Sequence, residues 1–319
     1  MMDCTDRHDR FFLRLMSKNV MLYTEMVATK SAIHGDRKKI LSYSPEEKPL
    51  ALQVGGSNKE ELAEVAKIAE EMGYDEININ LGCPSKKVQK NMFGACLMKD
   101  PDLVAECINS MVNACKIPVT AKTRIGFDDT EEFNYLNNFI RKMKSAGSKT
   151  FILHARKAIL TGLTPKQNLN IPKLNYEMVY EIKKENPDLE IIINGGITKV
   201  DQINHHLNFC DGVMIGRSIY QNPYSLVEIE REIFKTEKLP TREEVVEKLL
   251  IYLEKEVKKG TKVNHIMRHT VGLYHGQIGS KNWKRYLSEN MMAKDSDFKK
   301  AKYIMNVAQN NEKAIQSNT

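Results

Sequence analysis

The sequence predicts an α/β protein made of a (β/α)8 TIM barrel followed by a small all-α helical bundle. Short β-like runs alternate with amphipathic helical patterns from residue 21 to residue 217, which is typical of parallel βαβ units. No G-x-G-x-x-G fingerprint follows an early strand, so a barrel fits this alternation better than a doubly wound sheet. From Thr241 onwards the pattern changes to helices alone.

Strand signals recur at a regular spacing through the barrel. The expected strands cover residues 21–26, 50–56, 76–81, 117–125, 150–156, 190–195 and 212–217. Because a barrel of this kind has eight strands, one more is needed. We therefore expect the first strand to lie upstream of Met1, so that the barrel of this chain is truncated at its first strand.

Helix start signals lie between these strands. Ser57 and Glu60 form a capping box before a helix that stops at Gly73. Asp100 and Pro101 open a second helix, with proline at the first helical position. Two further helical patterns cover residues 131–147 and 175–187.

The change of pattern predicts two domains, a barrel over residues 1–238 and a helical domain over residues 239–319. Pro240, Gly260 and Gly276 separate the helical patterns of the second domain. These patterns cover residues 242–260, 264–276, 282–290 and 297–315. Helices of this length with short connections predict a small bundle.

The positive charge is concentrated in this helical part. The whole chain carries a net charge of +7, and the residues from Thr241 onwards carry 15 Lys/Arg against 9 Asp/Glu. The preceding 240 residues carry 33 against 32 and are nearly neutral. A neutral body with a basic appendage suits a polyanionic partner such as a nucleic acid, but on charge alone the plainer alternative of a lysine-rich solvated surface is favoured, because such surfaces are common.

The sequence indicates neither a membrane protein nor a secreted disulfide framework. No apolar run approaches the roughly 18 residues that a membrane span needs. Residues 1–20 lack the apolar core of a signal peptide. The six cysteines form no C-x-x-C pair, so they indicate reduced thiols in a cytoplasmic protein and no metal site.

Polar residues collect at the expected carboxyl ends of the strands, where a (β/α)8 barrel carries its chemistry. Core packing alone predicts apolar residues at these places. The polar residues are Glu25, Gln53, Asn80, Cys83, Lys122, Arg124, His154, Arg156, Asn194, Gly195, Gly196, Gly216 and Arg217.

Several of these residues indicate an anionic ligand. Lys122 lies within an apolar strand, where a charge is costly unless an anion meets it. His154 ends a strand beside Arg156, which favours a functional role over that of an ordinary core histidine. The glycines at 195–196 and the pair 216–217 match the phosphate site that such barrels often build after their last two strands.

Cys83 follows a strand directly and lies between Gly82 and Pro84, which fix a turn. This turn aims the thiol over the mouth of the barrel. No second thiol or histidine stands at ligand spacing, which disfavours a metal site. The local sequence leaves two roles open for Cys83, general acid and nucleophile.

The chain carries the segments MDCTDRH, LYTEM, LQVGG, GYDEININLGCPS, FGACLM, IPVTAKTRIG, HARKA, INGGI, DGVMIGR and YQNP. It also carries LTGLTPKQN, NHIMRH and NWKRYLSEN. Together these segments resemble the tRNA-dihydrouridine synthases, and most of all their bacterial A-type subfamily. The resemblance runs from residue 1 to about residue 290.

The resemblance implies an FMN-dependent barrel with a C-terminal tRNA-binding domain. NADPH would reduce the flavin, which would pass a hydride to C6 of a uracil extruded from the D-loop of tRNA, at positions 20 and 20a. By this resemblance Cys83 is the general acid that protonates C5.

The resemblance also implies roles for individual residues. The expected FMN-binding residues are Met1, Met2, Gln53, Lys122, His154, Asn194, Gly195, Gly196, Gly216 and Arg217. The expected tRNA-binding residues are Asn80, Lys166, Leu169, Arg268, Lys281 and Lys284. Leu169 stands about where the subfamily often carries an arginine, and Trp283 is expected to pack between helices. We expect a monomer without a metal ion or a membrane partner.

Two other functions fit part of these observations. An FMN-dependent reductase of a small molecule, in the manner of dihydroorotate dehydrogenase, would keep the flavin site and leave the basic helical part unexplained. A non-catalytic RNA-binding barrel would have no use for Cys83, Lys122 and His154.

Overall fold

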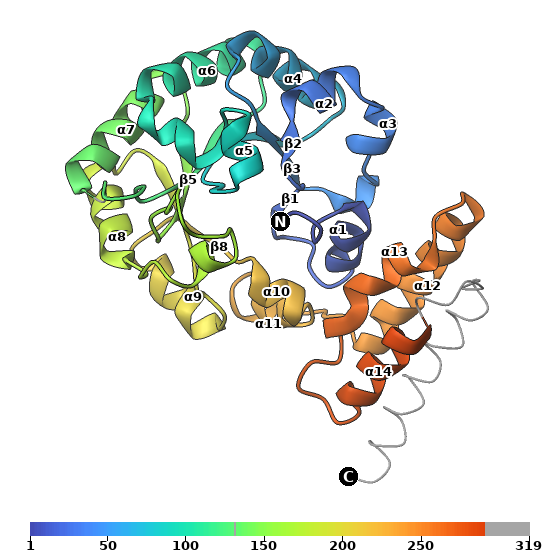
Figure 1. The fold of residues 1–319 in the computed structure, drawn as a ribbon. Coiled ribbons are helices and arrows are strands. Elements are labelled where there is room, and N and C mark those ends of the chain that lie inside the picture. Colours follow the sequence, from blue (N-terminus) through green and yellow to red (C-terminus); the bar gives the residue numbers. More distant parts are fainter. Residues whose placement is uncertain (131, 291–319) are drawn as a thin grey trace. The chain divides into compact units, whose positions relative to one another are not determined.

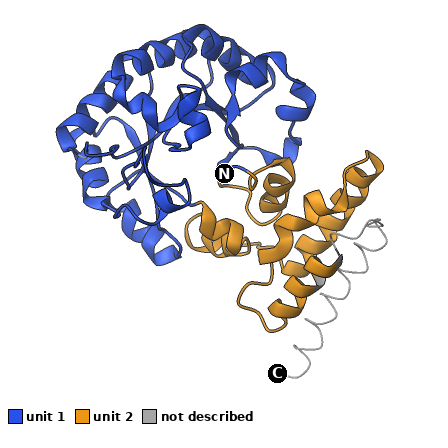
Figure 2. Ribbon diagram, in the orientation of Figure 1, with its two compact units in different colours: residues 1–2, 21–215 blue, residues 3–20, 216–319 orange. Residues whose placement is uncertain are grey.

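The computed structural model describes residues 1–130 and 132–290 and is shown in Figure 1. The chain forms two compact units, which Figure 2 shows in different colours. The first unit holds residues 1–2 and 21–215, and the second holds residues 3–20 and 216–319. Each unit is described by itself. The domain boundary predicted between residues 238 and 239 stays a prediction.

The first unit is built on a parallel sheet. Its strands are β1 (Leu22–Tyr23), β2 (Val27–Ala28), β3 (Leu50–Gly55), β4 (Glu76–Leu81), β5 (Val119–Arg124), β6 (Thr150–His154), β7 (Glu190–Asn194) and β8 (Gly212–Met214). The strand order is β1-β3-β4-β5-β6-β7-β8, and β2 pairs with β3. Of the strand predicted over residues 21–26, Leu22–Tyr23 forms β1, and β2 lies just beyond the predicted end, after an irregular segment. The other six strands lie where the sequence predicts them.

Helices follow the strands of this unit. They are α2 (Thr29–His34), α3 (Arg37–Ile40), α4 (Lys59–Glu71), α5 (Lys86–Lys90), α6 (Pro101–Ala114), α7 (Phe133–Ser145), α8 (Tyr176–Glu185) and α9 (Val200–Leu207). Short 3-10 helices cover Pro45–Glu47, Gly94–Lys99 and Gln167–Leu169. Figure 1 shows α4, α6, α7, α8 and α9 on the outside of the curled sheet. This arrangement confirms the predicted barrel class.

One predicted helix start is shifted by a residue. The N-cap of α4 is Asn58, whose side chain accepts a hydrogen bond from the backbone N–H of Glu61, in place of the predicted Ser57 and Glu60. Asparagine caps at least as well as serine, so the adjacent residue takes the role. The start of α6 is confirmed, because the Asp100 side chain caps it through the backbone N–H of Leu103 and Pro101 is its first residue.

The described part of the second unit is helical. It contains α1 (Arg7–Arg14), α10 (Arg217–Gln221), α11 (Ser225–Glu232), α12 (Arg242–Lys258), α13 (Val263–Met267), a 3-10 helix (Arg268–Gly272) and α14 (Ser280–Asn290). A capping box of Thr241 and Glu244 begins α12. Val245, Leu249 and Leu253 on one face of α12 are fully buried, which shows that these helices share a core. The helix predicted over residues 297–315 lies outside the described residues.

No helix within residues 1–130 and 132–290 combines the length and the apolar character that a membrane crossing requires.

Candidate active site

The register of the sheet aligns the predicted polar residues at the carboxyl ends of the strands. Asn80 of β4 pairs with Lys122 of β5. His154 of β6 pairs with Asn194 of β7. The Nζ atom of Lys122 donates a hydrogen bond of 3.2 Å to Oδ1 of Asn194. Residues that are far apart in the sequence therefore form one cluster in the first unit.

Lys122 is a half-buried cation at the end of β5. Burial, together with the nearby positive charge of Arg124, lowers its pKa to about 8. Burial likewise lowers the pKa of Arg124 to about 10. The guanidinium of Arg124 is satisfied by backbone carbonyls, including that of Gly82 at 2.9 Å from Nε. An anionic ligand would reduce the free-energy cost of keeping Lys122 charged, and this cluster is suited to bind such a ligand.

The backbone of Cys83 is held from two sides. Oδ1 of Asn80 accepts hydrogen bonds from the N–H groups of Gly82, at 3.2 Å, and Cys83, at 3.0 Å. On the other side the N–H of Ala95 donates to the Cys83 carbonyl over 2.9 Å. Gly94 has a φ of +80°, and a Cβ atom built there would lie 2.6 Å from the Cys83 carbonyl oxygen. The turn predicted around Cys83 is therefore fixed by contacts from the end of β4 and from the Gly94–Lys99 3-10 helix.

The glycine pair after β7 lies against His154. Gly195 has a φ of +121° and Gly196 a φ of +70°, both in the region that favours glycine. A Cβ atom on Gly195 would lie 2.8 Å from the His154 ring. The hydroxyl of Tyr176 donates to the Gly195 carbonyl over 2.6 Å. Glycine is needed here because the backbone passes the histidine too closely for a side chain.

Three polar residues that were not predicted from the sequence are hydrogen-bonded to this cluster, namely Asn78, Thr120 and Glu76. Gln53, which was predicted, donates from Nε2 to Oδ1 of Asn78 over 2.9 Å. Asn78 donates to Thr120, and Thr120 donates to Glu76. The signal for them was present in the alternation of β4, where Glu76, Asn78 and Asn80 share one face.

The sequence matches the dihydrouridine synthase family over residues 1–315. The chain belongs to this family. A tRNA-dihydrouridine(20/20a) synthase of Shewanella oneidensis is 52% identical over 291 residues, which cover 91% of this chain and 87% of that protein. The enzyme of the same name from Synechocystis is 49% identical, with coverage of 92% and 88%. That from Escherichia coli K12 is 51% identical, with coverage of 91% and 84%.

Four further residues were predicted to bind FMN in this dihydrouridine synthase family member, namely Met1, Met2, Gly216 and Arg217. Met1 and Met2 belong to the first unit and are 38% and 56% exposed. Gly216 and Arg217 belong to the second unit, where they are the N-cap and the first residue of α10. The roles predicted for these four residues stay predictions.

Lys166 and Leu169 lie in the segment between β6 and α8. Lys166 is exposed and Leu169 is half-buried at the end of a 3-10 helix. The buried side chain of Asn168 holds this segment, because Oδ1 accepts from the N–H of Ile159 at 2.7 Å and Nδ2 donates to its carbonyl at 2.9 Å. The exposed lysine is thus presented on an ordered segment, and its predicted contact with tRNA stays a prediction.

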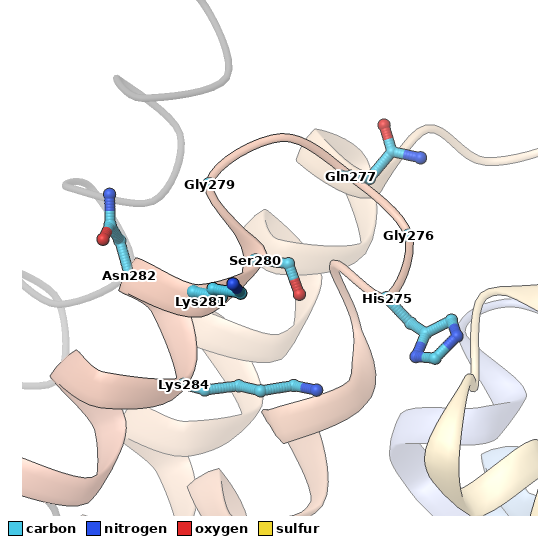
Figure 3. Close-up of a pocket in the computed structure, with 8 residues that line it drawn as sticks. All are labelled: His275, Gly276, Gln277, Gly279, Ser280, Lys281, Asn282 and Lys284. Carbon is cyan, nitrogen blue, oxygen red and sulfur yellow. The ribbon is translucent and has the colours of Figure 1, made fainter.

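Lys281 and Lys284 lie in the second unit and line an open pocket of about 590 Å³. Figure 3 shows the loop that arches from His275 to Ser280 and leads into α14, which carries both lysines. Gly276 and Gly279 adopt φ values of +76° and +85°, which shape this loop. Trp283 on the same helix is 5% exposed and donates to the Thr270 carbonyl over 3.0 Å. The prediction that Trp283 packs between helices is confirmed.

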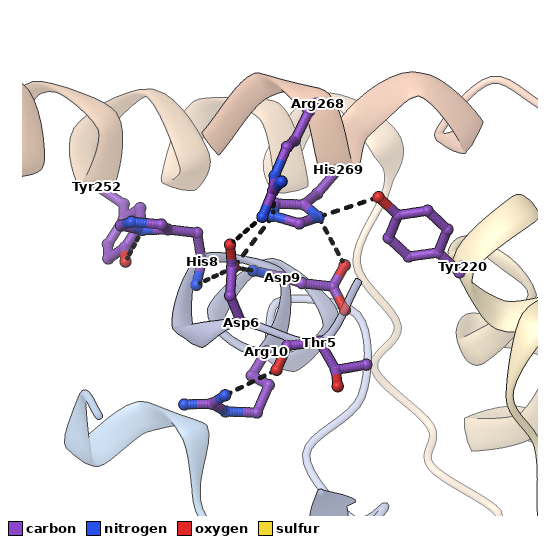
Figure 4. A network of polar contacts seen from close by, with 9 residues as sticks. All are labelled: Thr5, Asp6, His8, Asp9, Arg10, Tyr220, Tyr252, Arg268 and His269. Carbon is purple, nitrogen blue, oxygen red and sulfur yellow. Dashed lines mark hydrogen bonds and ion pairs between the residues drawn. The ribbon is translucent and has the colours of Figure 1, made fainter. Parts of the chain in front are cut away.

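Arg268 takes part in a polar network of the second unit, shown in Figure 4. Its guanidinium forms an ion pair of 2.6 Å with Asp6, the N-cap of α1. His269 Nε2 lies 3.0 Å from the same carboxylate, and His269 Nδ1 lies 3.6 Å from Asp9. Burial raises the pKa of Asp9 well above its usual range. The network joins α1 to the C-terminal helices, and the predicted contact of Arg268 with tRNA stays a prediction.

Within the described residues no group of three His, Cys, Asp or Glu side chains has an arrangement that could hold a metal ion.

Proposed function

We propose that this protein is a tRNA-dihydrouridine synthase, which reduces the C5=C6 bond of uridine in tRNA. The relatives that carry this name are 49 to 52% identical over nine-tenths of the chain, which supports tRNA over a small-molecule substrate. The same names favour positions 20 and 20a, in the D-loop. The observation that carries the proposal is the mounting of Cys83 by Asn80 beside the cluster of Lys122 and Asn194.

The residues of the first unit fit FMN with NADPH as its reductant. Lys122 provides a half-buried cation, and Gln53 and Asn194 provide amide groups able to bond a polar ring edge. The Gly195 backbone passes so close to the His154 ring that a side chain there would clash with it, so glycine is what allows this backbone to lie beside the histidine. When bound there, FMN would supply a hydride to C6 of the uracil ring.

Cys83 would deliver the proton to C5. A uracil within a stacked loop exposes neither reacting carbon, so it must be extruded before reaction. Hydride and proton then arrive from opposite faces of the ring, which requires the acid on a loop facing the cofactor. Asn80 would orient Cys83 through the backbone and meet the substrate nucleotide. As a general acid the thiol needs no activation to thiolate, in contrast to a cysteine nucleophile.

Binding of tRNA would use the basic second unit. Lys281 and Lys284 are exposed on α14, and Lys166 is exposed in the first unit. Their contacts would be with phosphates, which position the tRNA without reading its bases. We further propose that the protein works as a monomer in the cytoplasm, where its tRNA substrate and reduced thiols are found.

The test compares Cys83→Ala with Cys96→Ala, which removes a half-buried thiol on the neighbouring Gly94–Lys99 segment. We expect Cys83→Ala to bind flavin and oxidise NADPH, yet to form dihydrouridine in unmodified tRNA about 100-fold or more slowly, the usual loss for a missing general acid. Cys96→Ala should match the wild type. Full product formation by Cys83→Ala would refute the general acid. A wild-type protein that reduces a small enone and leaves tRNA unchanged would refute the tRNA substrate.

A further inference from the structure

Polar side chains run without interruption through the interior of the first unit, from the Cys83 turn to Glu76. The strand β4 alternates strictly, with Ile77, Ile79 and Leu81 fully buried on one face. The opposite face carries Glu76, Asn78 and Asn80, where a barrel interior is usually filled by Val, Ile and Leu. Because unsatisfied polar groups in such a place are costly, this column must be hydrogen-bonded throughout.

The column is a continuous chain of hydrogen bonds in which each donor meets an acceptor. The backbone N–H of Cys83 donates to Oδ1 of Asn80 over 3.0 Å. Nδ2 of Asn80 donates to Oε1 of Gln53 over 2.9 Å. Nε2 of Gln53 donates to Oδ1 of Asn78 over 2.9 Å. Nδ2 of Asn78 donates to Oγ1 of Thr120 over 2.7 Å, and this hydroxyl donates to Oε1 of Glu76 over 2.5 Å.

Every donor in this chain points toward Glu76. A side-chain amide has a donor end and an acceptor end, so each link fixes the orientation of the next. Oε1 of Glu76 accepts from Thr120 and also from the hydroxyl of Tyr23, over 2.9 Å. Because the hydroxyl proton of Thr120 is donated to the carboxyl group, Oγ1 of Thr120 is left to accept a hydrogen bond from Nδ2 of Asn78. The same constraint fixes the amide of Asn78, then that of Gln53 and then that of Asn80, so that Oδ1 of Asn80 faces the Cys83 turn.

We propose that Glu76 is a positioning residue for Cys83, which acts through Thr120, Asn78, Gln53 and Asn80. The carboxyl oxygen sets the direction of the chain, and the direction decides which end of the Asn80 amide meets the backbone N–H groups of Gly82 and Cys83. Aligned hydrogen bonds also polarise one another, which strengthens each link. The inference rests on the proposed function, because it assigns Cys83 a task that needs accurate placement.

Reversing the donor direction of this hydrogen-bond chain has a defined structural consequence. In Glu76→Gln an amide replaces the carboxyl group, and when its Nε2 atom faces Thr120 it donates to that hydroxyl, which then donates toward Asn78. Each amide downstream would turn over, and Asn80 would present Nδ2 to the N–H of Cys83. Two donors facing each other cannot bond, so the turn would lose the contacts that hold it from the Asn80 side.

The experiment uses the full chain with Glu76→Gln, Thr120→Val and Thr120→Ser. Tyr23→Phe is the matched control, because it removes the other hydrogen bond to the same buried oxygen without touching the chain. Three quantities are measured. They are kcat and KM for dihydrouridine formation in tRNA, and the rate of alkylation of Cys83 by iodoacetamide, followed by peptide mass spectrometry.

We expect Glu76→Gln and Thr120→Val to lower kcat roughly 10- to 100-fold with KM unchanged, the loss that follows from a small misplacement of a reacting group. Both should change the alkylation rate of Cys83. Thr120→Ser restores the hydroxyl and should restore kcat. The variant that combines Glu76→Gln with Thr120→Val should be no slower than the slower single variant, since both break one chain. If Glu76→Gln does not fold, the near-isosteric Thr120→Val carries the same test.

Wild-type kcat in folded Thr120→Val overturns the inference, because this variant removes the hydroxyl that links Glu76 to Asn78. An equal loss in Tyr23→Phe also overturns it, because the effect would then come from the buried carboxyl group and not from the chain. A wild-type protein that leaves tRNA unchanged, with the alkylation pattern as expected, refutes the proposed function and leaves the mounting of Cys83 in place.

Discussion

The ammonium group of Lys122 lies 3.2 Å from the amide oxygen of Asn194. Desolvation of this ammonium group, together with the nearby charge of Arg124, lowers the pKa of the lysine to about 8. In the described part of the chain no ion pair joins Lys122 to a carboxylate. A partly desolvated cation that is matched by an amide alone lowers the stability of the unliganded protein and is available to an anion.

Lys122→Met should raise the free energy of unfolding of the flavin-free protein at pH 7, on the order of 1–3 kcal/mol. The folded pKa of about 8 lies below the ordinary 10.5, so between these pH values the unfolded chain binds more protons. Wild-type stability therefore rises through this window, and the advantage of the variant shrinks. Urea denaturation at pH 7 and above pH 10 measures the free energy of unfolding of the wild type and of the variant. Lys67→Met, on the exposed side of α4, is the control, and a less stable Lys122→Met would contradict the argument.

Gly94→Ala should slow dihydrouridine formation by displacing Cys83. Its new methyl group would lie 2.6 Å from the Cys83 carbonyl oxygen and 3.3 Å from the Cys83 Cβ. Gly162→Ala is the matched control, because Gly162 has a similar φ of +85° and a Cβ atom built there would meet no other atom within 4 Å. Both variants carry the positive-φ cost of roughly 1–2 kcal/mol. Product formation per folded protein separates them, and equal rates would show that the contact is unimportant.

Asp6→Asn and Asp9→Asn should change stability at pH 7 in different ways. Burial raises the pKa of Asp6, but hydrogen bonds and charges from His269, Arg268 and the α1 backbone outweigh burial and hold it below its usual range. Its carboxylate thus contributes stability that is lost as the pH falls through that range. Asp6→Asn should cost roughly 1–3 kcal/mol.

The neighbouring Asp9 behaves in the opposite sense. Its folded pKa is raised, so ionisation at higher pH removes stability, and its Oδ2 atom has no hydrogen-bond partner among the described residues. An uncharged amide at this place should leave the free energy of unfolding at pH 7 unchanged or higher. Circular dichroism during urea denaturation compares the two variants, and an equal loss in both would contradict the assignment.

Neutralising Lys281 or Lys284 should weaken tRNA binding and reduce its dependence on salt. Each removed phosphate contact lowers the slope of log affinity against log salt by about 1. Lys248→Ala removes an exposed lysine of α12 outside the pocket and should leave the slope unchanged. Filter binding at several salt concentrations provides the slopes. A slope that drops equally in all three variants would mean that the helical unit contributes only a diffuse positive charge.

The sequence predicted the elements that depend on local patterns. Alternating apolar residues located six of the strands to within three residues at each end, and start signals such as Asp100-Pro101 located helices. The capping residue of α4 was misplaced by one position, because Ser57 and Asn58 are both good N-caps and only the backbone geometry decides between them.

Contacts between distant residues could not be predicted in this way. The ion pair of Asp6 with Arg268 spans 262 positions and groups residues 3–20 with the second unit, which no local pattern shows. For β4, the alternation predicted two faces. It did not show that Glu76, Asn78 and Asn80 form one hydrogen-bonded column with Gln53 and Thr120 from the neighbouring strands.

Trp283 is the one tryptophan of the chain, and it lies buried in the second unit beside Tyr274, with a ring separation of 5.4 Å. Its fluorescence therefore reports the unfolding of that unit, whereas far-ultraviolet ellipticity reports both. A single denaturation series, read by both signals, will show whether the two units melt together or one after the other. The chain thus carries its own probe for the cooperativity of its two parts, without any label.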